Sequence, residues 1–261
     1  TVGRLDLRFP LDLLVRDVKA VEPNTNDTLL SLERLKVELR LWKLLKKEVE
    51  IEEISIRNAT FDTRDFIDGV VVNGHLGELY LESHGVVFSP ETARINEFSV
   101  KNTDVSLTLE NMEDTDTTTT EPIYWKILLD EIDFENVGFA LNMPQDSLFV
   151  RTMLPKTTLK DGVIDLKEAS YYVKSFDMDN AELAYGLKEE LSLKKIGLQL
   201  DSIYYCGRDI RANVEEFVFK ERSGLELVST EGRIASDSVF IQIPKFTMRT
   251  TASSLDLQTK I

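Results

Sequence analysis

The sequence predicts an all-β protein with one short helix, in which the strands form an elongated, creased antiparallel sheet built from repeats. Apolar and polar residues alternate along most of the 261-residue chain, which is typical of strands with one apolar face and one wet face. An eleven-residue pattern also recurs through the chain. Recurrence at such spacings is typical of stacked or ribbon-like architectures. We therefore expect one elongated domain over residues 1–261.

The repeated pattern reads apolar-x-x-apolar-x-apolar-x-Asn-x-x-apolar. Four copies occupy residues 51–61, 95–105, 129–139 and 173–183. A fifth copy at residues 214–224 keeps the first half of the pattern but has Glu221 in the asparagine position. Successive asparagines lie 44, 34 and 44 residues apart; they are Asn58, Asn102, Asn136 and Asn180.

The asparagine coincides with a shift in the alternation of apolar residues. In the second copy, Phe98 and Val100 have even numbers, whereas Val105 and Leu107 have odd numbers. If both pairs share one face, the residues around Asn102 must absorb one extra residue as a β-bulge or a tight turn. Asparagine suits either, because it tolerates left-handed backbone. Aligned bulges would crease the sheet into a trough with an apolar interior, and an ordinary sandwich with a sealed core is the alternative.

The apolar residues of the repeats are the candidate lining of this trough. A lining of aliphatic and aromatic groups offers no discrete tight site, which suits an acyl chain that slides. The candidate lipid-binding residues are Ile54, Ile56, Phe98, Val100, Val105, Leu107, Ile132, Phe134, Phe139, Leu141, Phe176 and Met178.

Four further segments have distinctive patterns. Residues 41–48 predict a short helix that closes the end of the sheet or contacts anionic headgroups of a membrane, with Trp42, Lys43, Lys46 and Lys47 as its candidate residues. Asn-Gly at residues 73–74 and Asp-Gly at residues 161–162 predict hairpin turns. The acidic, Thr-rich residues 110–122 predict a mobile loop between repeats.

Composition argues against several classes of function. A net charge of −15 does not suit a nucleic-acid partner. His75 and His84 have no second ligand at metal spacing, so we expect no metal and no cofactor. The sequence shows no phosphate-binding loop and no nucleophile motif. Its acidic pairs occur at equivalent positions of the repeats, which indicates a solvated face rather than a catalytic site. We therefore do not expect an enzyme. No apolar stretch is long enough to span a bilayer, and both ends of the sequence read as strands of a structure that continues.

Residues 27–63 resemble the N-terminal signature of the AsmA-like superfamily, and within it the TamB family: a strand, a short Leu-rich helix, and a strand ending in Asn-x-x-Phe. Residues 9–23 and 224–257 resemble further segments of that family. The resemblance implies a taco-like groove that is open at both ends and lined with apolar side chains. It also implies location in the periplasm of a two-membrane bacterium, with an inner-membrane anchor outside this sequence. TamB proteins are much longer than this chain, which would then be an N-terminal piece.

The implied function is the conduction of phospholipid, through its acyl chains, between the inner and outer membranes, or assistance in outer-membrane protein translocation and assembly. The implied partner is an outer-membrane barrel similar to TamA. A structural β-solenoid or adhesin-like spacer without a lipid path is the alternative. A carbohydrate-active β-solenoid enzyme is a third possibility, but it requires a cluster of Asp, Lys or Arg side chains at one coil, and the sequence shows none.

Overall fold

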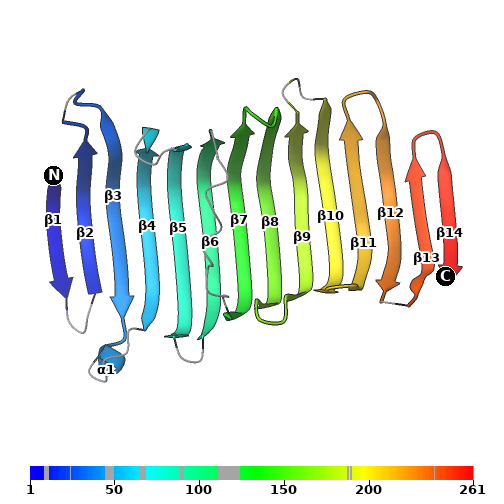
Figure 1. The fold of residues 1–261 in the computed structure, drawn as a ribbon, viewed down its shortest axis with the longest axis horizontal. Helices are drawn as coiled ribbons and strands as arrows, with labels where there is room; N and C mark the ends of the chain where they lie inside the picture. Colours follow the sequence, from blue (N-terminus) through cyan, green and yellow to red (C-terminus); the bar gives the residue numbers. More distant parts are fainter. Residues whose placement is uncertain are drawn as a thin grey trace.

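The computed structural model describes residues 1–8, 12–23, 25–44, 50–64, 69–88, 91–110, 124–186, 188, 190–237 and 239–260. Within these residues, fourteen strands lie in one sheet, and their order in the sheet is their order in the chain (Figure 1). The all-β prediction is confirmed. The strands are β1 (Val2–Arg8), β2 (Asp12–Val21), β3 (Thr28–Leu39), β4 (Ile51–Asp62), β5 (Val70–Phe88), β6 (Glu91–Leu109), β7 (Lys126–Met143), β8 (Leu148–Asp165), β9 (Ser170–Tyr185), β10 (Leu191–Cys206), β11 (Asp209–Glu221), β12 (Glu226–Ser236), β13 (Ile241–Thr250) and β14 (Ser254–Lys260).

One neighbouring pair breaks the antiparallel order. Strands β6 and β7 are parallel, whereas every other pair of neighbours is antiparallel (Figure 1). As a result, the four strands that carry complete repeats, β4, β6, β7 and β9, all run in the same direction. The repeat spacing follows from this arrangement, because 44 residues accommodate an intervening antiparallel strand and 34 residues accommodate none. The sequence predicted an antiparallel sheet without singling out this parallel pair, which requires a long connection.

The four repeat asparagines mark equivalent kinks inside long strands, as predicted. Their φ angles are 49°, 51°, 54° and 54°, all in the left-handed region that asparagine tolerates. Asn102 and Asn136 lie side by side in the parallel pair, since the residues on either side of them are in register. The Asn136 Nδ2 group donates a hydrogen bond to Asn102 Oδ1 at 3.3 Å. Left-handed residues Asp17 and Lys195 on β2 and β10 continue this crease line.

A second crease line crosses the sheet where the pattern reads apolar-x-x-apolar. Asp161 has a φ of 52° within β8, and the register shifts near Ser83 on β5 and near Leu200 on β10. Polar side chains link the strands along this line. Asn96 donates to Asp130 at 2.9 Å, and Lys174 donates to Asp161 at 2.9 Å. In each repeat the first two apolar positions are three residues apart, so one has an even number and the other an odd number. The sequence pattern therefore already included the parity shift of this second crease line.

Both predicted hairpin turns are wrong. Asn73 and Gly74 lie inside β5, and Asp161 and Gly162 lie inside β8. Asp161 uses its left-handed backbone to form a bulge rather than to reverse the chain. Gly74 permits a close approach of β6, because a Cβ atom there would lie 2.3 Å from the Asp104 carbonyl oxygen.

Helix α1 (Leu41–Leu44) begins where the sequence predicted. Trp42 is 74% exposed, so it does not pack on the sheet, and Lys43 Nζ lies 3.7 Å from Glu50 Oε2. Residues 45–48 of the predicted helix, with Lys46 and Lys47, lie outside the described residues. The predicted mobile loop at residues 110–122 also lies outside them, except for Glu110.

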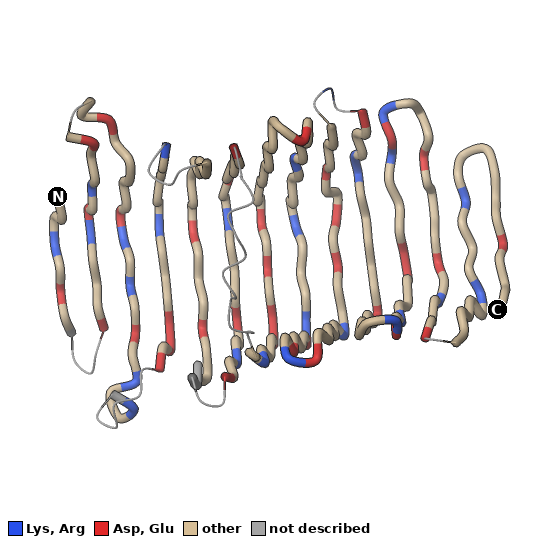
Figure 2. The backbone as a smooth tube through the Cα atoms, in the orientation of Figure 1, with Lys and Arg blue, Asp and Glu red and all other residues tan. Residues whose placement is uncertain are grey.

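No second layer covers the sheet in the described part of the chain, where the substantial contacts between elements join sheet neighbours. The accessible surface is 17,059 Å², whereas a compact protein of 29.8 kDa exposes about 11,600 Å². The alternative of a two-sheet sandwich is therefore wrong for these residues. The molecule is one open, curled sheet, and the lower ends of β7–β10 turn out of the plane of the view (Figure 2).

Candidate functional site

An unbroken apolar row crosses the whole sheet. Fourteen residues, one from each strand, lie directly opposite one another, and every one except Gly232 has an apolar side chain. With strands about 4.8 Å apart, the row is about 62 Å long. Residues directly opposite one another share a face of the sheet. The row consists of Leu7, Leu13, Val37, Ile54, Leu81, Phe98, Ile132, Leu159, Phe176, Leu200, Val214, Gly232, Phe246 and Leu257.

A second row runs beside the first from β1 to β11. It is apolar except at Thr157, and the rings of Phe98 and Phe134 join the two rows edge-to-face at a centroid distance of 6.2 Å. The second row consists of Leu5, Val15, Leu35, Ile56, Leu79, Val100, Phe134, Thr157, Met178, Leu198 and Phe217.

The structure brings the twelve predicted lining residues together in four rows. Eight of them belong to the two long rows, because Ile54, Phe98, Ile132 and Phe176 share the first and Ile56, Val100, Phe134 and Met178 share the second. Beyond the asparagine crease, Val105 lies opposite Phe139, and Leu107 lies opposite Leu141. Their contact with lipid stays a prediction.

Seventeen of the twenty-five residues in the two long rows were not among the predicted lining residues. The strands between the repeats supply Leu13, Val37, Leu81, Leu159 and Leu200, which carry no repeat motif. Their alternation was visible in the sequence. Their alignment with the repeats was not, because cross-strand register depends on connections and bulges elsewhere.

Burial differs along the apolar face. Val100 is 7% exposed, whereas Phe139, beyond the asparagine crease, is 39% exposed. None of the larger side chains is completely buried among the described residues. Within the two rows, Leu5 and Leu7 on β1 are 63% and 68% exposed, so exposure is high at the first strand and low at Val100.

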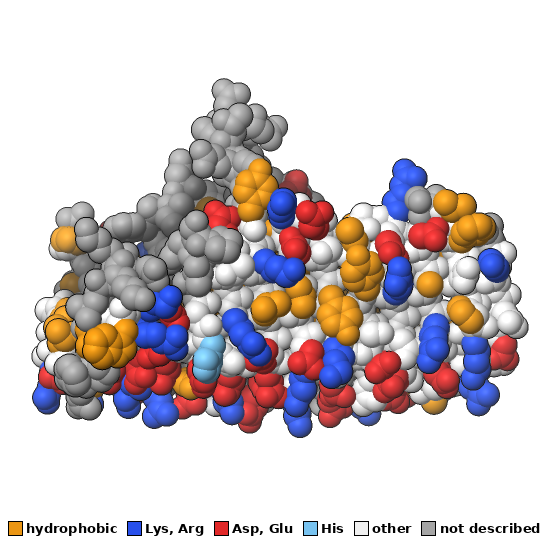
Figure 3. Space-filling model, turned by 90° about the horizontal axis from the view of Figure 1, so that it is seen from below, with side chains coloured by type: hydrophobic (Ala, Val, Ile, Leu, Met, Phe, Trp, Pro, Cys, Tyr) orange, Lys and Arg blue, Asp and Glu red, His pale blue; other side chains and the backbone are white. Residues whose placement is uncertain are grey.

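The opposite face of the sheet is charged. Four arginines lie in register on β1–β4, and six carboxylates lie in register on β2–β7 (Figure 2). In Figure 3, which looks along the strands, charged side chains line the lower edge of the molecule. The arginines are Arg4, Arg16, Arg34 and Arg57; the carboxylates are Asp12, Glu38, Glu53, Glu82, Glu97 and Glu131.

Bridging side chains hold the carboxylate row together. Lys36 Nζ donates hydrogen bonds to both carboxylate oxygens of Glu53 at 3.1 and 3.2 Å and also pairs with Glu38. Tyr80 donates a hydrogen bond to Glu82 at 3.1 Å. Partial withdrawal from water, together with the carboxylate of Glu82, raises the pKa of the Tyr80 phenol to about 12. These like charges would destabilise the face without such partners.

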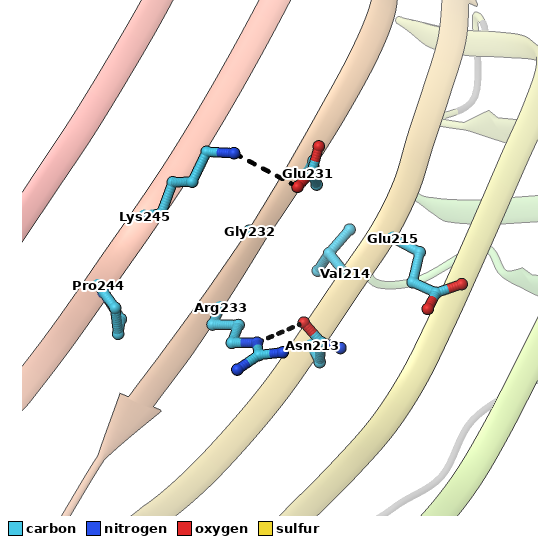
Figure 4. Close-up of a pocket in the computed structure, with 8 residues that line it drawn as sticks. All are labelled: Asn213, Val214, Glu215, Glu231, Gly232, Arg233, Pro244 and Lys245. Carbon is cyan, nitrogen blue, oxygen red and sulfur yellow. Dashed lines mark hydrogen bonds and ion pairs between the residues drawn. The ribbon is translucent and has the colours of Figure 1, made fainter.

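Three shallow depressions, of about 570, 420 and 260 Å³, are lined mainly by polar and charged side chains. Figure 4 shows the largest of the three, in which Lys245 Nζ lies 3.5 Å from Glu231 Oε1 and Arg233 Nε donates to Asn213 Oδ1 at 3.2 Å. Because these groups satisfy one another, the depression offers little to an apolar ligand. The apolar rows are therefore the stronger candidate surface.

Neither metal chemistry nor a membrane-spanning helix is apparent in the described ranges. No group of His, Cys, Asp or Glu residues there could hold a metal ion, and no helix there is long and apolar enough to cross a bilayer. No protein-family model matches this sequence, and no curated protein matches it either.

Proposed function

We propose that the protein is a periplasmic groove protein that binds phospholipid acyl chains along its apolar rows and conducts them between the inner and outer membranes. One observation carries the proposal: the first apolar row is unbroken across all fourteen strands, and no described residue covers it. A surface about 62 Å long is far more than one ligand needs. It suits a ligand that moves along the row.

The expected energetics favour sliding over tight capture. Burying about ten CH2 groups stabilises a bound acyl chain by about 8 kcal/mol. The freedom lost on association costs about 4–15 kcal/mol, so the net affinity for a single chain is weak. Because equivalent residues repeat about every 4.8 Å, a shift by one strand changes the contacts little, and the barrier to movement is low.

The surroundings of this conduit follow from the sequence resemblance. We propose that the full protein is anchored in the inner membrane and meets an outer-membrane barrel similar to TamA. Assistance in outer-membrane protein translocation and assembly is part of the same proposal. A spacer without a lipid path would require a sealed apolar face, and the described residues supply no cover for it.

The first experiment asks whether phospholipid copurifies with protein prepared without detergent, measured by mass spectrometry of an organic extract. The second places a charge in the second row with Val100→Asp or Phe134→Asp. We expect modest destabilisation and loss of photo-crosslinking to phospholipid, because an open surface can hydrate a carboxylate.

Ser106→Asp is the matched control, because Ser106 alternates with the lining residues Val105 and Leu107 on the same strand as Val100. We expect it to leave both crosslinking and stability near those of the parent protein. The proposal fails if the parent protein yields neither copurified nor crosslinked phospholipid and the groove variants lose several kcal/mol. That result would indicate a sealed core and favour the spacer.

A further inference from the structure

One row of charged side chains on the charged face changes character along the sheet. From β4 to β9 the sign of the charge alternates from each strand to the next, whereas from β1 to β4 it is positive throughout. The alternating part consists of Arg57, Glu78, Lys101, Glu135, Lys156 and Asp179. The positive part consists of Arg4, Arg16, Arg34 and Arg57.

Like charges directly opposite one another destabilise a sheet, so the positive part requires partners. Its two ends have them. Arg4 Nε lies 2.8 Å from Asp6 Oδ2, and Arg57 Nε lies 3.7 Å from Glu78 Oε1. The two arginines in the middle, Arg16 and Arg34, form no hydrogen bond or ion pair with any described residue.

Carboxylates are not scarce in this chain, which has 46 Asp and Glu residues against 31 Lys and Arg residues. Two of them, Asp17 and Glu33, are the chain neighbours of the unpaired arginines. Neither forms an ion pair with Arg16 or Arg34, and Glu33 instead accepts a hydrogen bond from the Asn58 side chain. The positive charge in the middle of the row is therefore not neutralised within the described part of the chain.

The unpaired guanidinium groups are open to a ligand. Arg16 and Arg34 are both half-buried. The Nε atom of Arg34 is closed to water and has no partner, but none of the terminal nitrogens of the two arginines is buried in this way. The terminal nitrogens can therefore donate to an acceptor that approaches from solvent.

We propose that Arg16 and Arg34 together bind a phosphate group on the charged face of the sheet. A carboxylate matches one planar guanidinium fork with its two oxygens, whereas a phosphate has oxygens on several sides and can accept from two forks at once. The two arginines lie on neighbouring strands about 4.8 Å apart, so one phosphate can reach both. The phosphate is a free ion or the headgroup of a phospholipid, and the chemistry of recognition is the same.

This site lies on the face opposite the apolar rows, because Arg16 alternates with the row residue Val15 on β2. A lipid whose chains lie on the rows cannot place its headgroup there. The inference thus goes beyond the proposed conduit, and neither depends on the other.

The first test measures binding of inorganic phosphate by isothermal titration calorimetry at low ionic strength, because salt screens such interactions. We expect Arg16→Gln and Arg34→Gln each to weaken binding about tenfold, since each removes charged hydrogen bonds. Arg34→Lys keeps the charge but loses the fork, and it should weaken binding about threefold. Without phosphate, the glutamine variants should unfold at the same temperature as the parent or higher, because they remove repulsion between neighbouring arginines.

Arg249→Gln is the matched control for the loss of one positive charge. Arg249 lies on β13 between Ser229 and Ser254, with no second arginine opposite it and no ion pair within the described residues. We expect this variant to bind phosphate as the parent does.

The second test distinguishes the two sources of phosphate by flotation with vesicles of phosphatidylcholine, with or without phosphatidic acid. If a headgroup is the ligand, phosphatidic acid should increase the bound fraction of the parent but not of Arg16→Gln, and inorganic phosphate should compete. If free phosphate is the ligand, calorimetry should show binding that depends on Arg16, and phosphatidic acid should make no difference to flotation.

Two results would overturn the site. One is a parent protein that binds neither inorganic phosphate nor phosphatidic acid vesicles in preference to phosphatidylcholine alone. The other is an equal loss of binding in Arg16→Gln, Arg34→Gln and Arg249→Gln, since net charge rather than paired arginines would then be responsible. Neither result bears on acyl chains bound to the apolar rows.

Discussion

Replacing Asn136 with valine tests whether the repeat asparagines create the crease. Asn136 has a φ of 54° inside β7. A left-handed backbone costs an ordinary L-residue about 1–2 kcal/mol, and a β-branched side chain is at the upper end of that range. The variant also loses the 3.3 Å hydrogen bond to Asn102, worth about 0.5 kcal/mol at an exposed site. We expect Asn136→Val to lower the free energy of unfolding by about 2 kcal/mol in urea titrations.

Two further variants separate backbone strain from loss of the side chain. Asn136→Gly loses the same hydrogen bond but adopts a positive φ without strain, so it should cost about 1 kcal/mol, mainly through unfolded-state entropy. Asn142→Val changes an asparagine of the same strand that has no positive φ, and it should be nearly neutral. The reasoning is refuted if Asn136→Val costs no more than Asn136→Gly, or no more than Asn142→Val.

Two further predictions concern β5. Gly74→Ala should destabilise the protein by about 2 kcal/mol or more in urea titrations, because its Cβ atom would meet the backbone of β6; a neutral result would contradict the close approach of the two strands. The raised pKa of Tyr80 means that the folded protein favours the neutral phenol. The stability that Tyr80 contributes is therefore fully present below pH 10 and is lost as the pH rises from 10 to about 12. Spectrophotometric titration should show that Tyr80→Phe removes the last tyrosinate step, and the variant should lose less stability over that pH range; an unchanged last step would assign it to another tyrosine.

The sequence determined that the four repeat asparagines form kinks and which parity is apolar. Alternation with period two requires strands, and asparagine at a parity shift requires a bulge if the face is to stay apolar. Both inferences are local, since they depend on a few neighbouring residues. For the same reason, Asn58 and Asn102 could be placed correctly before any contact between strands was known.

Local rules failed where two competing structures use the same residues. Asn73 with Gly74, and Asp161 with Gly162, have the backbone freedom of a hairpin turn, and the same freedom serves a close strand approach or a bulge. Tertiary pairing decided between these outcomes, because only an uninterrupted β5 and β8 can hydrogen-bond along their full length to both neighbours. The sequence could not supply that information.

By itself, the sequence determined an all-β chain of repeated, kinked strands with one apolar face and one charged face. Only the tertiary structure decided that the strands form a single open layer, that β6 and β7 run parallel, and that apolar residues from fourteen strands align in one row. The physical reason is that alternation fixes the face on which a side chain lies, whereas register and sheet order depend on hydrogen bonds between residues far apart in the chain.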